Sequence, residues 1–582
     1  MRIVAPILYA VATSVLLATA FAFVFGGMDV ISAWISLGAG ALLGVWSAWT
    51  RGKSESRRPP PGAWEWLAII VFALASARAF LWLVFTDGDS IKVLSPNNLG
   101  DLSLHITYIR HLASGVPFWP DNPIFAEAKL TYPVGIDLFN TLLTLAGVSP
   151  WRGLIWAGVV GAALTGIALW RWGRGIALAA LIANGGLAGF AMIATGHLAD
   201  FQSDLAWKNI FLALFVTQRG LLFAVPAGLL LMMSWHARFF RGDHRDRLPL
   251  WGELLLYASL PIFHLHTFIF LSLMLAAWFV LQPPARRSLA GFVALSLVPA
   301  TALVFLVTGG FGGTGRLGIK PGWMWDDLTW LQWCENHLPG SPLLNAMLLF
   351  WPINFGILLV AVPWLAGRLW KDRGATWERA LFFPALFIFL LCVFVKFAPW
   401  EWDNTKLMIW SWLAIMPLLW QALIASRPLW QRAIAAALFF GSGIVSLLGG
   451  LDGSHIGYDL ALRSELDGVE KAVAGIPTSE RFVGYPTYNH PLLLIGRKMV
   501  LGYTGHAWSH GLPWEKTGAR VDALLNGEAA WRQAAADLHV RYLYWGSEER
   551  ERYKASAQPW RESARRIAEG DWGELYDLSS AP

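Results

Sequence analysis

Long apolar runs are the feature of this sequence that most limits what it can fold into. A helix needs about 20 mostly apolar residues to cross the hydrocarbon core of a membrane, and backbone groups inside that core must be paired within the helix. The sequence therefore predicts a mainly α-helical, polytopic membrane protein with about 13 transmembrane helices. The apolar runs lie near residues 3–25, 29–49, 64–86, 154–172, 175–195, 219–237, 250–263, 264–282, 289–308, 341–366, 379–397, 406–425 and 432–451.

Composition agrees with lipid as the solvent of most of the chain. Hydrophobic residues make up 56% of the 582 residues and charged residues only 14%, too few to cover a soluble fold with so much apolar surface. The net charge of +6 comes from Arg and Lys in short clusters between apolar runs, which indicates topology signals and argues against a nucleic-acid partner. Cys334 and Cys392 offer no disulfide framework.

The basic clusters predict the orientation, because short cytoplasmic loops carry an excess of Arg and Lys. With a cytoplasmic N-terminus, the clusters fall on the cytoplasmic side of a cytoplasmic (inner) membrane. They are Arg51, Lys53, Arg57 and Arg58; Arg171 and Arg174; Arg238, Arg241, Arg245 and Arg247; Arg286 and Arg287; Arg368, Lys371, Arg373 and Arg379; and Arg427 and Arg432. Loops 87–153, 196–218, 309–340 and 398–405 then lie outside. The segment 132–148 is too short to cross and is interpreted as a helix at the outer interface.

The chain divides into a transmembrane domain, 1–452, and a C-terminal domain, 453–582, in which charges become frequent and apolar runs shorten. The same topology places this second domain in the periplasm or outside the cell. Its pattern predicts a small α/β domain. Candidate strands are 482–485, 498–501 and 540–544, and candidate helices are 457–475, 514–537 and 547–568.

The first outer loop contains Gly100-Asp101-Leu102-Ser103-Leu104-His105, in which helical spacing would make Asp101 and His105 neighbours. An aspartate beside a cation, at the edge of a low-dielectric cavity, suits a general base that takes a proton from a hydroxyl. The alternative is that Asp101 only caps the start of its helix, since Asp is a favoured N-cap.

The second outer loop leads from Asp204 to Gln218 and Arg219. Arg219 begins an apolar run on the side opposite the other basic clusters, so the charge rule for loops does not explain it. Such a cation usually has an anionic partner. A lipid phosphate and Asp204 are the two candidates.

His264 and His266 lie at the break between two adjacent apolar runs. Alternate histidines can bind a metal ion, but two ligands without an adjacent carboxylate are a weak signal. A structural role or a hydrogen bond to a phosphate oxygen is the favoured interpretation, and no metal ligands are assigned.

A short loop between two apolar runs holds Trp402, Asp403, Asn404 and Lys406. It can form a sugar-binding corner, in which Trp stacks on the ring while Asp403 and Asn404 hold hydroxyls. The alternative is an interfacial anchor with exposed salt bridges, each of which would contribute little.

In the tail, Trp508 and His510 belong to a stretch dense in aromatic and imidazole groups beside glycine, from Gly502 to Gly511. Glycine allows tight turns, which would place these side chains on loops at one edge of the domain. They could close over the membrane site or pack the domain against the helices, and both interpretations stay open.

Together these motifs resemble the GT-C superfamily of membrane glycosyltransferases, which includes protein O-mannosyltransferases and aminoarabinose transferases. The resemblance rests on Asp101 in the first long outer loop, on the step Leu130-Thr131-Tyr132-Pro133 and on the helix count. Further motifs look like those of an uncharacterised prokaryotic branch of the family: Gln218-Arg219-Gly220, His264-Leu265-His266-Thr267, 400–406 and 502–511.

The resemblance implies an inverting enzyme that moves a sugar from a polyprenyl-phosphate donor to an acceptor hydroxyl on the outer face. Asp101 would act as the base, and Arg219 and Lys406 would stabilise the phosphate leaving group. A single Asp101 in place of the Asp-Glu pair of mannosyltransferases argues against protein mannosylation. Asp87 and Asp89 are alternative carboxylates.

The second hypothesis is a non-enzymatic transporter or assembly factor for lipid-linked saccharides. A transporter needs ionisable groups near the middle of its helices, and Arg78 is the clear case. The sugar, the acceptor (lipid, glycan or protein) and the participation of a divalent cation stay open, as does the oligomeric state. Membrane lipids are expected partners.

Overall fold

The computed structural model describes residues 3–50, 59–242, 246–310, 317–326, 328–452 and 456–580, so the predicted topology signals Arg51, Lys53, Arg57, Arg58 and Arg245 lie outside the described residues. Within them, nine helices are long and apolar enough to cross a membrane, which confirms the mainly helical, polytopic class. These are α1 (Val4–Phe25), α2 (Val30–Thr50), α3 (Ala63–Leu81), α6 (Pro150–Ile182), α8 (Leu221–Trp235) continued by η3 (His236–Arg241), η4 (Pro283–Ala285) with α11 (Arg286–Thr308), α15 (Thr376–Phe394), η5 (Glu401–Asn404) with α16 (Thr405–Leu419) and η6 (Trp420–Ile424), and α17 (Leu429–Gly450).

Three further predicted runs form shorter or bent helices. The run 341–366 is a pair, α13 (Pro342–Phe355) and α14 (Leu358–Lys371), bent by 75°. The runs 250–263 and 264–282 are α9 (Leu250–Phe263) and α10 (Leu265–Leu281), separated at His264, whose side chain caps α10 by accepting the amide N–H of Thr267. The predicted break at this point is therefore present.

The predicted helix 175–195 is only partly helical. α6 passes through a kink at Gly173 and Arg174 and ends at Ile182, and only short turns follow, η1 (Ala188–Ala191) and α7 (Met192–Thr195). The chain stays irregular until the single turn η2 (Phe211–Phe215) and then enters α8. Apolar composition predicted a full helix here, but Asn184, Gly185 and Gly186 interrupt it.

Buried asparagines satisfy the backbone of this irregular segment. Asn184 accepts the amide N–H of Ile210 at 2.6 Å and donates to the carbonyl of Lys208 at 2.8 Å. Asn209 donates to the carbonyl of Ile182 at 3.0 Å. Both asparagine side chains are fully buried. A side-chain amide carries a donor and an acceptor, so it replaces the hydrogen bonds that a helix would have made.

The first long loop begins as a hairpin and then forms two helices that reach the bundle end. Strands β1 (Val84–Asp87) and β2 (Ser90–Val93) precede α4 (Asn97–Ala113); the short pair β3 (Asp121–Asn122) and β4 (Phe125–Lys129) leads to α5 (Gly135–Leu145). Because α4 begins at Asn97, Asp101 lies within the helix, and the interpretation of Asp101 as its N-cap is wrong.

The C-terminal part contains a sheet formed by β8 (Phe482–Val483), β9 (Tyr542–Trp545), β10 (Arg565–Gly570) and β11 (Gly573–Asp577). Its strand order is β10-β11-β9-β8, and only β8 and β9 pair in parallel. The predicted helix 547–568 is instead two short helices, at Ser547–Arg552 and Trp560–Ser563, and its last residues enter strand β10. The remaining elements are β5 (Gly318–Ile319) paired with β6 (Val395–Lys396), α12 (Leu328–His337), β7 (Tyr458–Leu462), α18 (Arg463–Val473), α19 (Pro491–Leu494), α20 (Thr504–Ser509), α21 (Glu515–Leu525), α22 (Trp531–Asp537), α23 (Ser547–Arg552), α24 (Trp560–Ser563) and η7 (Leu578–Ser580).

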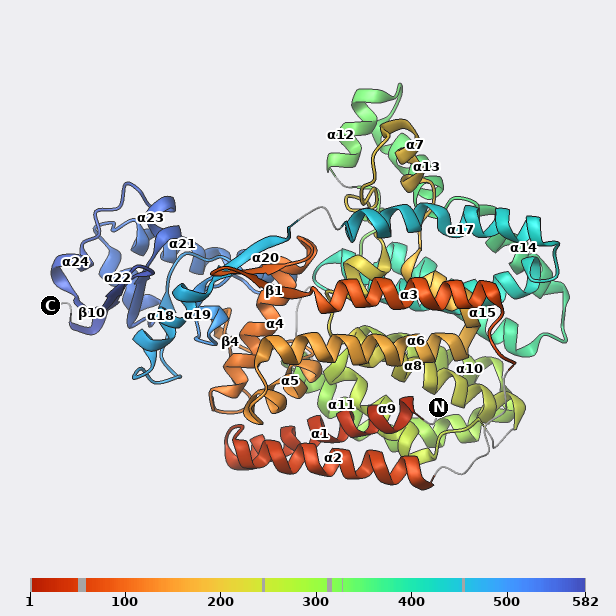
Figure 1. The fold of residues 1–582 in the computed structure, drawn as a ribbon, viewed down its shortest axis with the longest axis horizontal. Helices are drawn as coiled ribbons and strands as arrows, with labels where there is room; N and C mark the ends of the chain where they lie inside the picture. Colours follow the sequence, from red (N-terminus) through yellow and green to blue (C-terminus); the bar gives the residue numbers. More distant parts are fainter. Residues whose placement is uncertain are drawn as a thin grey trace.

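The C-terminal part lies at one end of the helix bundle, beside α4 and the β1–β2 hairpin (Figure 1). β7 adds to that hairpin as a third antiparallel strand. Lys498 forms an ion pair with Asp121 at 2.9 Å, and the His111 ring contacts the carbonyl of Gly496 at 3.0 Å. These contacts fix the C-terminal part against the loop that carries Asp101.

Replacing Asn209 tests the role of the buried amides. Asn209→Ala leaves the carbonyl of Ile182 without its donor, and each unpaired buried group costs about 1–3 kcal/mol. We expect a lower free energy of unfolding, measured by denaturant titration in detergent micelles. The exposed Asn526→Ala variant is the control and should leave stability unchanged. Equal stability of the two variants would contradict the role assigned to Asn209.

Candidate active site

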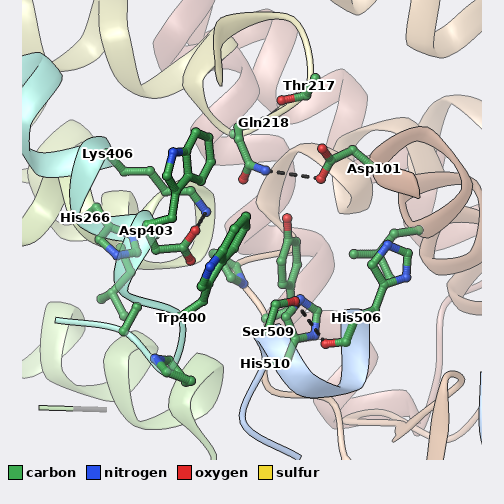
Figure 2. Close-up of a pocket in the computed structure, with 18 of the residues that line it drawn as sticks. Asp101, Thr217, Gln218, His266, Trp400, Asp403, Lys406, His506, Ser509 and His510 are labelled. Atoms are coloured by element: carbon green, nitrogen blue, oxygen red, sulfur yellow. Dashed lines mark hydrogen bonds and ion pairs between the residues drawn. The ribbon is translucent and has the colours of Figure 1, made fainter. Parts of the chain in front are cut away.

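A cavity of about 440 Å³ lies at the end of the bundle that faces the C-terminal part. Its walls come from α4, the step before α5, the segment before α8, the α9–α10 break, the loop before α16, and α20. Segments hundreds of residues apart in the sequence therefore meet here. Figure 2 shows the Asp101 side chain on one side of the cavity and the Asp403 and Lys406 side chains on the other.

Asp101 projects from α4 and is held by a neighbouring amide. Its carboxylate accepts a hydrogen bond from Nε2 of Gln218 at 3.1 Å, in the segment just before α8 (Figure 2). Burial raises the pKa of the Asp101 carboxyl above its ordinary value, because a low-dielectric environment disfavours the charged form. A carboxylate with a raised pKa is a stronger base than an exposed aspartate.

Two lysines supply positive charge to the same cavity. Nζ of Lys406, in the first turn of α16, lies 3.0 Å from the carboxylate of Asp403. Lys208 comes from the irregular segment, and its ammonium group lies 5.6 Å from the centre of the Trp402 ring. Lys406 is only 8% exposed, so its charge acts in an environment that water screens poorly.

Tryptophans form an aromatic wall beside these charges. The rings of Trp400 and Trp402 lie 5.0 Å apart, and Trp508 from α20 lies 5.8 Å from Trp400. The indole N–H of Trp402 donates to the carbonyl of Ala206 at 2.9 Å, which fixes its ring. Flat, rigid rings at fixed positions suit stacking on the apolar face of a sugar.

The histidine pair at the α9–α10 break also lines the cavity. Nδ1 of His264 is bonded to the hydroxyl of Thr267 at 2.8 Å, and that hydroxyl accepts the indole N–H of Trp410 at 2.8 Å. The Nε2 atoms of His264 and His266 are buried and have no hydrogen-bond partner among the described residues. Both nitrogens are thus available to a ligand oxygen.

His506 in α20 and His510 just after it form part of the cavity wall contributed by the C-terminal part. Their rings stack with centres 6.4 Å apart, and His510 lies 5.2 Å from Tyr132. Burial lowers the pKa of His506 to about 3 and that of His510 to about 4. Both imidazoles are therefore neutral at physiological pH and can each donate one hydrogen bond.

A buried polar layer lies behind the cavity. Nδ1 of His105 contacts the Asp137 carboxylate at 2.8 Å, and both side chains are inaccessible to solvent. Arg219 is buried against the Phe80 ring and donates to the carbonyl of Leu154. His105 and Arg219 do not line the cavity.

Of the predicted site residues, nine line the cavity: Asp101, Gln218, His264, His266, Trp402, Asp403, Lys406, Trp508 and His510. The other four lie elsewhere. Asp204 is exposed outside the cavity, His105 and Arg219 belong to the buried layer, and Asn404 is buried, bonded to the backbone of Phe397 and Cys392. Neither the predicted Asp204–Arg219 pairing nor Asn404 as a sugar ligand agrees with this geometry.

The alternative carboxylates Asp87 and Asp89 belong to the β1–β2 hairpin and its turn. Asp87 pairs with Lys92 at 2.8 Å, and Asp89 accepts hydrogen bonds from the backbone and hydroxyl of Ser464. Neither carboxylate lines the cavity.

Sequence reasoning did not assign Lys208, Trp400, Tyr132 or His506 to the site, yet all four line it. Trp400 and His506 belong to motifs that were already singled out, and their spacing from Trp402 and His510 was the available signal. Lys208 carried none, because its position depends on the irregular segment. Tyr132 belongs to the step Leu130-Thr131-Tyr132-Pro133, which supported the family resemblance but was not assigned to the site.

The part of the chain that the structure describes contains no group of three or more His, Cys, Asp or Glu side chains placed to hold a metal ion. The charged groups that line the cavity are Asp101, Asp403, Lys208 and Lys406. With the histidines neutral, two carboxylates and two ammonium groups leave the cavity close to electrical balance.

Comparisons with known proteins gave structural likenesses only. No protein-family model matches the sequence, and no curated protein matches it. Among solved structures, the chain is similar to the apo crystal structure of an oligosaccharyltransferase from Archaeoglobus fulgidus, with a TM-score of 0.47 and 11% identity over 85% of this chain and 71% of that one.

The His105–Asp137 pair gives a test of the buried layer. His105→Phe leaves the Asp137 carboxylate buried without its partner, which costs about 3 kcal/mol or more. The double variant His105→Phe/Asp137→Leu should lose less stability than the sum of the single variants, because no charged group is left unpaired. Denaturant unfolding in micelles measures this coupling. Glu470→Gln, which removes an exposed partner of Arg110 on the same helix, is the control and should cost under about 1 kcal/mol; additive losses in the cycle would contradict the pairing.

Proposed function

We propose that this cavity is the active site of a membrane glycosyltransferase, which moves a sugar from a polyprenyl-phosphate donor to an acceptor hydroxyl with Asp101 as the general base. The observation that carries the proposal is the convergence of a buried carboxylate with raised pKa, two lysines and an aromatic wall on one cavity at the end of the helices. The sequence resemblance to GT-C enzymes rests on motifs that meet at this same cavity.

Asp101 acts on the acceptor. Its carboxylate takes the proton from the acceptor hydroxyl as that oxygen attacks the anomeric carbon. The bond from the anomeric carbon to the phosphate oxygen breaks on the opposite face, and its electron pair stays on the phosphate, so the configuration inverts. The hydrogen bond from Gln218 orients the carboxylate for this step.

Lys406 and Lys208 are the cations that stabilise the lipid phosphate as it leaves. Both line the cavity, and Lys406 is fixed by Asp403. Ammonium groups held in a poorly screened site stabilise developing charge without reorganisation during the reaction. Lys208 takes the role that the resemblance implied for Arg219, because the guanidinium group of Arg219 lies in the buried layer.

The remaining walls suit the other parts of the donor. Trp400 and Trp402 offer faces for the sugar ring, while Val307 and Leu265 provide apolar surface for the first isoprenoid units. The Nε2 atoms of His264 and His266 can bond phosphate oxygens. Neutral His506 and His510 cover the cavity on the side of the C-terminal part, where they would exclude water.

The same proposal sets the orientation. A polyprenyl-phosphate donor presented in the outer leaflet requires the cavity and the C-terminal part to lie on the outer face of the cytoplasmic membrane. Arg238 pairs with Glu253 at 2.8 Å at the start of α9, so this basic cluster lies at the bundle end away from the cavity. This position of the cluster agrees with the cytoplasmic location that the sequence predicted for it.

The transporter hypothesis finds less support. A transporter needs ionisable groups near the middle of its helices, and Arg78 was the one clear case in the sequence. Arg78 instead lies in the last turn of α3, where its guanidinium donates to the carbonyl of Asp452 at 3.4 Å and lies 5.2 Å from the Trp82 ring. It belongs to the end of the bundle that carries the cavity.

The proposal is tested by measuring transfer from a panel of radiolabelled polyprenyl-phosphate sugars into a membrane extract. Asp101→Asn removes the base and should lower the transfer rate by about 10²–10⁴-fold. Asp204→Asn, a carboxylate in a nearby segment that does not line the cavity, is the matched control and should keep the parent rate. Equal rates for Asp101→Asn and the parent would remove Asp101 from the mechanism, and no transfer with any donor would reject the enzyme.

The pH dependence of the transfer rate should show one acidic limb that belongs to Asp101. The base works only when ionised, so the rate falls as the pH drops through its pKa, which burial has raised above the ordinary value of about 4. His506 and His510, with pKa values of about 3 and 4, add no limb near pH 6.5. Gln218→Leu removes a hydrogen bond to the carboxylate and should move the limb to higher pH; an unchanged limb would contradict the assignment.

A further inference from the structure

A second, larger cavity of about 890 Å³ lies at the opposite end of the bundle, among α3, α6, α15, α16, α17 and the α8–η3 helix. Helix α16 runs from the candidate active site to the second cavity and lines both. Lys406 in its first turn lines the candidate active site, and Pro417, eleven residues and about 16 Å further along the helix, lines the second cavity. The proposed function assigns no role to this cavity.

The kink in α6 forms the back of the second cavity. Gly173 packs so closely on α16 that a Cβ at this position would lie 2.5 Å from Cγ of Pro417. The next residue, Arg174, has a φ of 56°, which is costly for a residue with a side chain. Its guanidinium compensates through an ion pair with Glu65 and a contact 4.4 Å from the Trp170 ring.

Four arginines line this cavity, and they come from three of the basic clusters that predicted the topology: Arg171, Arg174, Arg241 and Arg432. Glu65 is the one acidic residue that lines it among the described residues, and it is already paired with Arg174. Three positive charges therefore remain in excess. A surface that served only as a topology signal would not need to gather arginines from separate connections around one cavity.

Two of these arginines are available to a ligand. Nε of Arg432 is buried and has no hydrogen-bond partner among the described residues. Arg241 is exposed and forms no ion pair with any residue that the structure describes; its charge acts on the ring of His236, which stacks on Trp377 at 4.0 Å. A buried guanidinium N–H without a partner, such as Nε of Arg432, is costly, so a site of this kind favours an anion.

The inner wall of the cavity is apolar. It is formed by aliphatic and aromatic side chains of the surrounding helices, including Ile182, Ala414, Leu418, Phe440 and Ile444. Trp172 and Trp420 add flat apolar surface to the lining. An ion alone would use none of this wall, whereas a molecule with a charged head and a hydrocarbon chain would use both parts.

We propose that this cavity binds an anionic phospholipid, with the headgroup phosphate at Arg241 and Arg432 and an acyl chain along the wall of α16 and α17. Guanidinium groups match phosphate oxygens in charge and geometry. Basic pockets between transmembrane helices bind anionic headgroups in this way. The lipid would hold the kinked α6 against α16 at the end of the bundle away from the candidate active site.

The test uses the full-length protein, delipidated in detergent and titrated with phosphatidylglycerol, phosphatidylcholine or inorganic phosphate, with bound ligand counted by native mass spectrometry. We expect saturable binding of phosphatidylglycerol that is tighter than binding of phosphatidylcholine. Arg241→Gln and Arg432→Gln should each weaken it about fivefold, and the double variant about 25-fold. Arg287→Gln, at the same end of the bundle but outside the cavity, is the matched control and should bind as the parent does.

Two further measurements distinguish a specifically bound lipid from a bound phosphate ion and from a nonspecific lipid shell. Ala436→Trp fills the apolar wall without changing charge, and it should lower the affinity for phosphatidylglycerol while leaving that for inorganic phosphate unchanged.

Phosphatidylglycerol with a photoactivatable chain should crosslink to peptides within 414–421 and 432–444 of the parent protein, which needs no variant. Competition by inorganic phosphate as effective as that by phosphatidylglycerol would replace the lipid by free phosphate. Equal losses in Arg287→Gln, or crosslinks spread evenly over the helices, would overturn the proposal.

Discussion

The pairing of backbone polar groups where water is excluded is the constraint on which the rest of this structure depends. Most of the chain meets it by forming helices, since each helix pairs its own N–H and C=O groups. The segment between α6 and α8 does not, and it relies on buried amide side chains, including Asn184, Asn209 and Asn354. Lys208 and Gln218 belong to this segment. The asparagines therefore determine the position of Lys208, one of the two lysines of the proposed active site, and of Gln218, the hydrogen-bond donor to Asp101. The cavity can therefore form only because the chain is not helical between α6 and α8.

Charge in the candidate active site is arranged so that one carboxylate stays unpaired with a cation. Lys406 lies against Asp403, whereas Asp101 contacts the neutral amide of Gln218. A direct ion pair would lower the pKa of Asp101 and weaken it as a base, while burial beside a neutral donor keeps that pKa raised. Neutral His506 and His510 also keep the pKa of Asp101 raised, because a charged imidazole next to the cavity would stabilise the carboxylate and lower that pKa.

The sequence predicted the helical class and most helix positions, because apolar runs of about 20 residues have few alternatives in lipid. It also selected Asp101, Lys406 and His510 as candidates, since polar groups at the ends of apolar runs need a reason to be there, and all three line the cavity. It could not predict the partners of Arg219 or Asn404. An arginine that stacks on Phe80 and an asparagine that caps a loop have the same sequence signature as ligand-binding residues. The irregular stretch within 175–195 was missed because amino-acid composition does not show which asparagine side chains form hydrogen bonds with the backbone.

The candidate active site cannot form from the transmembrane helices alone. Trp508, His506 and His510 belong to α20 and the residue after it. The position of α20 depends on the contacts that join the C-terminal part to the α4 loop, among them the β2–β7 pairing and the Lys498–Asp121 ion pair. These contacts join residues that are hundreds of positions apart in the chain. They can form only after the last transmembrane helix has been inserted, so the cavity must be completed late in folding. A site assembled in this way has no enclosed, water-poor environment until the whole chain is in place, and Asp101 acquires its raised pKa only then.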